Sequence, residues 1–354
     1  MSKFFTNRFQ ALTPYTPGEQ PRDMQYIKLN TNESPYPPSE KAVKAAATAA
    51  ARLQLYPDPT YKALHEALAA YHGVTPHMVL ATNGSDEILN FAFMAFCDEA
   101  HPALFADITY GFYSVFATLN HVPFTEIPLK ADFSLSVDDY IGKKGTVFIA
   151  NPNAPTGLAL PLSEIERLLA ADKNRVVVID EAYVDFGTES AVSLINRFEN
   201  LLVTRTFSKS RSMAGARLGY GIGSPALIAD LNTIKYSTNP YNVNSMSAAA
   251  GLGVMADEPY TVSCCQEIMK TRTNAMTGLK KLGFEMTDAR GNFLFVRHPK
   301  MSGEAIYLAL KKRGILVRHF NSTPISDYNR ITVGTPADMQ TLIDTLADIL
   351  KEIK

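Results

Sequence analysis

The strongest constraint on the fold is a series of short, continuously apolar segments that alternate with helical patterns between residues 79 and 221. These segments lack the alternation of apolar and polar residues that a half-exposed strand shows. Strands buried on both faces have this pattern, and they occur in parallel sheets covered by helices. The predicted fold class is therefore α/β, with a mostly parallel sheet in a large domain. The expected strands are 79–81, 103–106, 147–150, 176–179 and 201–206.

The two ends of the chain have a different character. The first forty residues contain six prolines, which are too many for a helix or a central strand and which predict an extended arm. After about residue 257 the pattern predicts two helices and two strands of a smaller α+β domain. The expected division is an arm that also contributes to the small domain (1–34), a large domain (35–256) and a small C-terminal domain (257–354).

Charge and cysteine content restrict the class of function. Lys and Arg total 34 against 35 Asp and Glu, so no excess positive charge is available for a nucleic acid or an anionic membrane. Any bound anion must meet a local site. Three cysteines, two of them adjacent, argue against a disulfide framework. With neither a signal-peptide pattern nor an apolar run of ~18 residues, a cytoplasmic protein is expected.

The polar residues that follow the expected strands are candidate site residues, because ligands of open α/β sheets bind beyond the carboxyl ends of the strands. Gly84, Ser85 and Asp86 begin a helix, where free N–H groups can bind a phosphate. Asp180 ends a buried strand, which implies a cationic partner. Lys209 follows another strand, with Arg217 eight residues later. A desolvated lysine at such a position can lose its proton and attack a carbonyl carbon.

Each of these residues also has a simpler explanation. The glycine turn can be a helix cap, the aspartate can belong to a structural salt bridge, and a lone lysine is usually a solvated surface group.

The glycine-rich string 219–223 lacks the frame of a dinucleotide loop, and His65-Glu66 lacks the second histidine of a zinc helix, so no metal site is expected. The combination at one edge of the sheet carries the argument. A lysine, an acid and a phosphate cradle are the parts that pyridoxal phosphate (PLP) requires.

The ordered motifs resemble those of fold-type I PLP-dependent aminotransferases. These motifs are Asn-Gly-Ser-Asp-Glu (83–87), Asp-Ile-Thr-Tyr-Gly (107–111), Asn-Pro-Asn-Ala-Pro-Thr-Gly (151–157), Asp-Glu-Ala-Tyr (180–183) and Ser-Lys-Ser (208–210). Within that superfamily the chain is most similar to histidinol-phosphate aminotransferases. The segments that indicate this are 14–18, 29–35, 56–59, 240–243, 317–318 and 330–334.

The resemblance implies roles for individual residues. Lys209 would form a Schiff base with PLP and move a proton, Asp180 would protonate the ring nitrogen, and Tyr183 would hold the ring's phenolic oxygen. The cofactor-binding set would be Gly84, Ser85, Asp86, Tyr110, Asn153, Thr206, Ser208, Lys209, Arg217 and Tyr56. Tyr56 would reach the phosphate of a partner subunit, which implies a homodimer. The substrate-binding set would be Tyr15, Asn32, Arg318 and Arg330.

One position departs from the family pattern. The common pattern has an asparagine immediately before Pro-Thr-Gly, whereas this chain has Ala154. Asn153 is the nearest substitute. By resemblance the reaction is transamination of L-histidinol phosphate with 2-oxoglutarate in histidine biosynthesis. Threonine-phosphate decarboxylation, aromatic amino-acid transamination and a non-catalytic PLP-binding regulatory domain remain alternatives.

Overall fold

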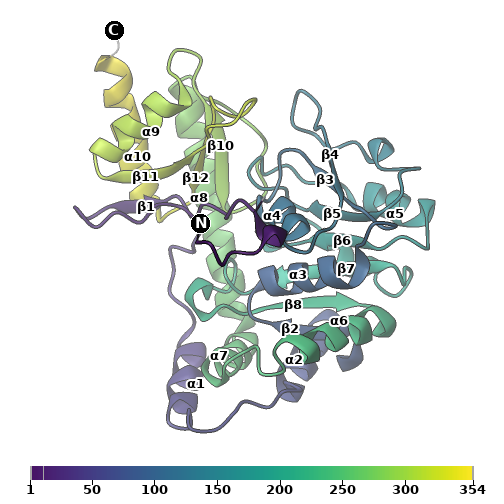
Figure 1. Cartoon of the computed structure of the whole chain (residues 1–354). Coiled ribbons are helices and arrows are strands. Elements are labelled where there is room, and N and C mark those ends of the chain that lie inside the picture. Colours follow the sequence, from purple (N-terminus) through teal and green to yellow (C-terminus); the bar gives the residue numbers. More distant parts are fainter. Residues whose placement is uncertain (1, 11, 353–354) are drawn as a thin grey trace.

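A computed structural model describes residues 2–10 and 12–352, and it contains two sheets (Figure 1). The larger sheet has seven strands in the order β2-β8-β7-β6-β5-β3-β4. Neighbouring strands from β7 to β4 are parallel, and β8 is antiparallel to both β2 and β7. The strands are β2 (Val79–Thr82), β3 (Ala103–Ala106), β4 (Phe124–Ile127), β5 (Thr146–Ala150), β6 (Val177–Asp180), β7 (Leu201–Thr206) and β8 (Gly219–Gly223).

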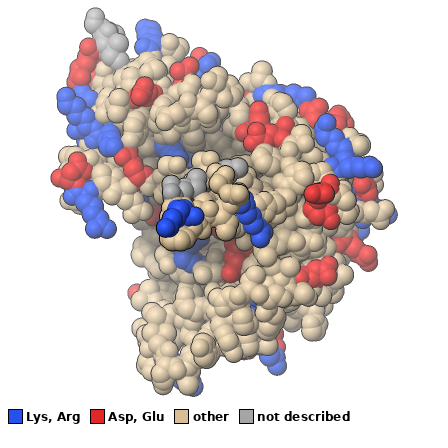
Figure 2. Space-filling model, viewed as in Figure 1, with Lys and Arg blue, Asp and Glu red and all other residues tan. Residues whose placement is uncertain are grey.

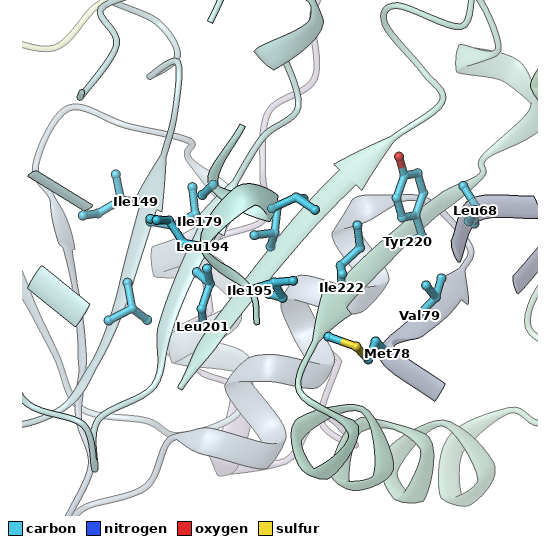
Figure 3. Packing of buried hydrophobic residues seen from close by; sticks show 14 of the residues in the cluster. Leu68, Met78, Val79, Ile149, Ile179, Leu194, Ile195, Leu201, Tyr220 and Ile222 are labelled. Carbon is cyan, nitrogen blue, oxygen red and sulfur yellow. The ribbon is translucent and has the colours of Figure 1, made fainter. Parts of the chain in front are cut away.

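The central strands are buried on both faces, as the apolar runs predict. Along β6, Val177 and Ile179 belong to one core cluster, whereas Val178 belongs to another on the opposite face. Figure 3 shows the first cluster, in which Ile149, Ile179 and Leu201 project from adjacent strands. Helices cover both faces: α1 (Glu40–Ala50), α2 (Lys62–His72), α3 (Ser85–Phe96), α4 (Phe112–Leu119), α5 (Leu162–Ala171), α6 (Pro225–Thr238) and α7 (Ser245–Met255).

The smaller sheet joins the two ends of the chain. Its five strands lie in the order β1-β11-β12-β10-β9, and β1 from the N-terminal arm is parallel to β11. The strands are β1 (Ile27–Leu29), β9 (Glu285–Met286), β10 (Phe293–Arg297), β11 (Ile315–His319) and β12 (Asn329–Thr332). The helices are α8 (Glu258–Lys281), α9 (Gly303–Lys312) and α10 (Pro336–Glu352). Leu29 of the arm shares a core cluster with residues of the C-terminal segment. We therefore propose that the arm and residues 257–354 form one structural unit.

The expected strands and the mostly parallel sheet are confirmed, but two strands of the large sheet, β4 and β8, were not expected. The glycine-rich string 219–223, which lacks the frame of a dinucleotide loop, forms the strand β8. Ser163 and Glu166 suggest a capping box, yet α5 begins at Leu162 and its N-cap is Pro161. Glu166 instead pairs with Arg197.

Two general properties of the surface bear on function. On the face shown in Figure 2, basic and acidic side chains are interspersed toward the edge, and uncharged residues cover much of the middle. Among the described residues, no helix combines the length and apolar character needed to cross a membrane.

The glycines of β8 allow a close approach to the start of α3. A Cβ atom at Gly219 would lie 2.4 Å from the backbone nitrogen of Ser85, whereas a Cβ at Gly223 meets its nearest atoms at 3.5 Å. Contacts with backbone atoms cannot be relieved by a rotamer change. We expect Gly219→Ala to lower the free energy of unfolding by about 1–3 kcal/mol. The matched variant Gly223→Ala should change it by less than about 1 kcal/mol. Urea denaturation of both variants, followed by circular dichroism, measures the difference, and equal losses would contradict this explanation.

Candidate active site

The carboxyl ends of four strands of the large sheet surround one cavity of about 340 Å³. Ser85 follows β2, Ala150 ends β5, Asp180 ends β6 and Thr206 ends β7. The cavity therefore lies where the topology of an open α/β sheet predicts a ligand site. The predicted site residues that line it are Ser85, Asp86, Tyr110, Asp180, Tyr183, Thr206, Ser208, Lys209 and Arg217.

Lys209 presents a buried amine to this cavity. Its Nζ donates a hydrogen bond to the carbonyl oxygen of Thr31 in the arm, at 3.2 Å. Burial lowers the pKa of Lys209 to about 8, and the positive charge of Arg330 acts in the same direction. A lysine with this pKa is partly neutral near physiological pH, so it has the lone pair that a nucleophile or a base requires.

Asp180 is a buried carboxyl group without a cationic partner among the described residues. It accepts hydrogen bonds from the hydroxyl groups of Tyr113 at 3.1 Å and Thr204 at 3.2 Å. Burial raises the pKa of Asp180 to about 6 despite these bonds. The position of Asp180 at the end of a buried strand implies a cationic partner, and no described residue supplies one. The carboxylate is therefore available to a positively charged N–H group in the cavity.

The N-terminal end of α3, the Ser208 hydroxyl and the Arg217 guanidinium together form a cradle for an anion. Gly84, with φ of 79°, precedes the helix, and a Cβ there would lie 2.8 Å from Nη2 of Arg217. Arg217 also contacts the Ser208 hydroxyl at 3.4 Å and the Asp86 carboxylate at 3.0 Å. Helix N–H groups, a guanidinium and hydroxyl groups together suit a phosphate.

Two tyrosines form further parts of the cavity wall. Tyr110 donates a hydrogen bond to Asp86 at 2.6 Å, which fixes its ring beside the cradle. Tyr183 has its hydroxyl group within 3.0 Å of the side-chain nitrogen of Asn32. Burial raises the pKa of Tyr183, so the phenol remains protonated at neutral pH.

Asn153 is not placed as the sequence predicts. Its side-chain oxygen accepts from Thr109 at 2.7 Å, and its nitrogen donates to the Ile108 carbonyl and to Thr156, both at 2.9 Å. These bonds anchor the proline-rich loop to the neighbouring strand connection, and Asn153 does not line the cavity. Ala154 lines it instead. The substitution of Asn153 for the missing family asparagine is therefore not supported by its position.

Arg318 and Arg330 lie directly opposite each other on β11 and β12. Arg330 is partly buried, donates to the carbonyl oxygen of Asn30 at 3.1 Å and leaves its buried Nε without a partner. Arg318 donates to the carbonyl oxygens of Thr16 and Pro17, both at 3.2 Å. Neither guanidinium pairs with a carboxylate of the described residues. Two adjacent unpaired cations favour an anionic ligand.

Tyr15, Asn32 and Tyr56 lie outside the lining of the cavity. Tyr15 stacks on Phe112 with ring centroids 4.3 Å apart. Asn32 is buried and bonded to Tyr183 rather than open to a ligand. Tyr56 is 82% exposed and stacks only on Tyr241, with ring centroids 4.6 Å apart. A substrate contact of Asn32 is therefore not supported by its position.

Sequence reasoning missed several residues around the cavity. Tyr113 and Thr204 bond Asp180, and Thr204 faces Asp180 in the register of β6 and β7. Thr204 is a polar residue that follows three apolar residues of the segment 201–206, and this position is a signal that could have identified Thr204. The arm supplies Gln20, Thr31 and Glu33 to the wall, and no local pattern indicates this long-range contact.

Comparison with known proteins assigns the class. Residues 24–346 match the family "Aminotransferase class I and II", and the chain belongs to this family. Histidinol-phosphate aminotransferases from Brachyspira hyodysenteriae and Acetobacter pasteurianus are 44% and 46% identical to it. The alignment with each covers 99% of this chain, and 100% and 99% of the two relatives respectively.

A solved structure shows the same fold. It is a histidinol-phosphate aminotransferase from Sinorhizobium meliloti in complex with pyridoxal-5'-phosphate, with a TM-score of 0.90 and 22% identity. The superposition covers 100% of this chain and 99% of that one.

The environment of Asp180 predicts a pH-dependent effect on stability. Because its folded-state pKa is raised from 3.8 to about 6, the folded state loses stability as pH rises from 3.8 to about 6, and the full penalty is present at pH 7. Asp180→Asn should therefore raise the free energy of unfolding of the ligand-free protein at pH 7, by roughly 1–3 kcal/mol. The gain should disappear below pH 4, where the wild-type carboxyl is protonated in both states. Urea denaturation at both pH values measures it.

The control for this prediction is Asp185, a carboxylate that pairs with Arg205. This ion pair lowers the pKa of Asp185 despite its burial. Asp185→Asn should lower the stability at pH 7 because it leaves Arg205 with one fewer anionic partner. Destabilisation by both substitutions at pH 7 would show that Asp180 is satisfied within the chain.

Proposed function

We propose that the protein is a PLP-dependent aminotransferase that transfers the amino group of L-histidinol phosphate to 2-oxoglutarate. The products are imidazole-acetol phosphate and L-glutamate, and the reaction belongs to histidine biosynthesis. The observation that carries the proposal is the cavity in which a partly neutral lysine, an unpaired buried carboxyl group and an anion cradle meet. The full-length relatives that are 44–46% identical specify the substrate.

The residues present fit PLP in two separate respects. The cradle of Gly84, Ser85, Ser208 and Arg217 suits its phosphate, and only glycine at position 84 leaves space beside the guanidinium. The carboxyl group of Asp180 suits a pyridinium N–H. When bound, PLP supplies an aldehyde that condenses with amines and a ring that withdraws electrons from the substrate Cα.

The chain's own groups position the reactants and move the proton. Lys209 Nζ, whose pKa is about 8, can remove the proton from the substrate Cα and deliver it to C4′, the aldehyde carbon that PLP would supply. Asp180 favours a protonated ring nitrogen because an anion beside that nitrogen stabilises its positive charge. Tyr183 directs a phenol toward the cavity, and Tyr110 forms part of the wall beside the cradle.

The paired arginines support a substrate site that accepts two kinds of anion. Arg330 is proposed to bind the α-carboxylate of glutamate, a group that histidinol phosphate lacks. Its buried Nε, which has no hydrogen-bond partner among the described residues, supports this assignment. Arg318 and Tyr15 are proposed to contact the substrate phosphate. A planar guanidinium binds carboxylate and phosphate with similar geometry, so one site can serve both substrates.

We also propose a cytoplasmic homodimer with shared active sites. Tyr56 is exposed and does not line the cavity of its own chain, as expected if it completes the site of a second copy. The three cysteines are free thiols, which suits a reducing compartment.

Covalent trapping tests the cofactor assignment. Protein loaded with PLP and reduced with sodium borohydride should carry a pyridoxyl group on Lys209, detectable by peptide mapping. Lys235 is an internal control, because burial also lowers its pKa to about 8. It bonds the Pro59 carbonyl and does not line the cavity, so it should remain unlabelled. Label on Lys235, or none on Lys209, would contradict the assignment.

A substrate panel tests the reaction. The PLP-loaded protein with 2-oxoglutarate should form glutamate from histidinol phosphate with a kcat/KM at least about tenfold above that for phenylalanine. Threonine phosphate should release no carbon dioxide. Carbon dioxide release would favour the decarboxylase, and preference for phenylalanine the aromatic enzyme. Lys209→Ala should abolish turnover in every enzymatic case, whereas a regulatory domain would show no turnover before the substitution.

A further inference from the structure

We infer that Asn32 is a positioning residue that fixes the hydroxyl proton of Tyr183, and that this chain uses it in the absence of an asparagine at position 154. The inference rests on the proposed function, because it concerns how Tyr183 meets the ring oxygen of PLP. It differs from the substrate contact that sequence analysis assigned to Asn32.

The side chain of Asn32 is held in one orientation. Its Oδ1 accepts a hydrogen bond from the hydroxyl of Thr332 at 3.0 Å, and its Nδ2 lies 3.0 Å from the hydroxyl oxygen of Tyr183. The Thr332 hydroxyl in turn accepts from the backbone N–H of Asn32 at 2.9 Å. Because the Thr332 hydroxyl donates its proton to Oδ1, the side-chain oxygen of Asn32 must face Thr332. The Nδ2 group therefore faces Tyr183 and donates a hydrogen bond to its hydroxyl oxygen.

The backbone of Asn32 is also tied to its surroundings. Its φ is 55°, in the left-handed region that asparagine tolerates better than most residues. Its carbonyl oxygen accepts from Asn292 at 3.0 Å, and the residue is 1% exposed. Thr332 lies on β12 of the small sheet, whereas Tyr183 follows β6 of the large sheet. Asn32 therefore links the two sheets through the tyrosine.

The consequence for Tyr183 follows from the direction of the bond. Because its oxygen accepts from Asn32, its own proton is free to be donated to an acceptor in the cavity. The adjacent wall is formed by the side chains of Ala154 and Ala182, which have no hydrogen-bonding group. With alanine in place of the family asparagine, Tyr183 thus offers its hydroxyl proton to the ring oxygen.

A hydrogen bond to an ionised oxygen stabilises the ionised form. In PLP-loaded protein, the visible absorbance of the bound cofactor changes with pH. A hydrogen-bond donor to the ring oxygen lowers the midpoint pH of this change. Tyr183→Phe removes the donor and should raise this midpoint by about 1 pH unit. Asn32→Gly tolerates the positive φ and removes only the amide, so it should raise the midpoint by about 0.5 pH unit.

A double-variant comparison distinguishes positioning from a general structural role. In a Tyr183→Phe background, Asn32→Gly should leave the midpoint unchanged, because no phenol proton remains to be oriented. A further rise of 0.5 pH unit in that background, or no effect of Asn32→Gly alone, would overturn the inference. Thr332→Val provides a second test if Asn32→Gly fails to fold, because it removes the hydroxyl that orients the amide. It should raise the midpoint in the same direction, and an unchanged midpoint would overturn the inference.

Failure of this inference can be separated from failure of the proposed function. If wild-type protein shows no cofactor absorbance and no label on Lys209, the proposed function fails. If the cofactor binds and Tyr183→Phe shifts the midpoint while Asn32→Gly and Thr332→Val do not, only the role of Asn32 is wrong.

Discussion

The structure depends on keeping charged groups away from water at one edge of the large sheet. Asp180 is buried at this edge, and Arg330, on β12 of the small sheet, is partly buried with a buried Nε; neither has an ion-pair partner among the described residues. Burying an unpaired charge costs several kcal/mol, which the rest of the fold must offset. Two apolar clusters on opposite faces of the seven strands provide that stabilisation and hold the strand ends in a fixed arrangement. A ligand that carries the opposite charge removes this cost when it binds. The site therefore favours ligands with such charges over other ligands.

The position of Lys209 shows how the burial of one group changes the chemistry of another. Desolvation alone disfavours its ammonium form, and the buried guanidinium of Arg330 adds to that effect. Glu33 and Asp86 oppose the change, which leaves the pKa at about 8 rather than lower. An amine adjusted in this way can both accept and release a proton near neutral pH. The reactivity of this residue is therefore a property of several elements rather than of the Ser-Lys-Ser motif.

Much of the fold could be predicted because buried parallel strands leave a strong signal in sequence. Runs such as 147–150 and 177–179 are continuous and apolar, and polar residues after them mark the cavity. The strand β8 was missed because its glycines resemble a loop, although they are required by the close approach of α3. The edge strand β4 was missed because three of its four residues are exposed.

The site was predicted less completely, for a related reason. Asn153 and Ala154 are neighbours in sequence, yet the first is bonded to the scaffold and the second faces the cavity. Local sequence does not specify which of two adjacent loop side chains points inward. Likewise, the contact between Asn32 and Tyr183 joins residues 151 positions apart. Such pairs depend on how the two sheets meet, which no single segment encodes.

The pairing of β1 with β11 has a consequence for how the protein is made. Ile27 lies opposite Ile315, so the arm acquires its strand partner only after nearly the whole chain has left the ribosome. Until then the carbonyl oxygen of Thr31 cannot be held near Lys209 by that sheet, and Asn32 lacks Thr332. A truncated or still-growing chain can fold its central sheet first, as domains commonly do during synthesis. In such a chain the contact between Lys209 and the arm is not yet supported by the small sheet, so completion of the site depends on strand β11 being made.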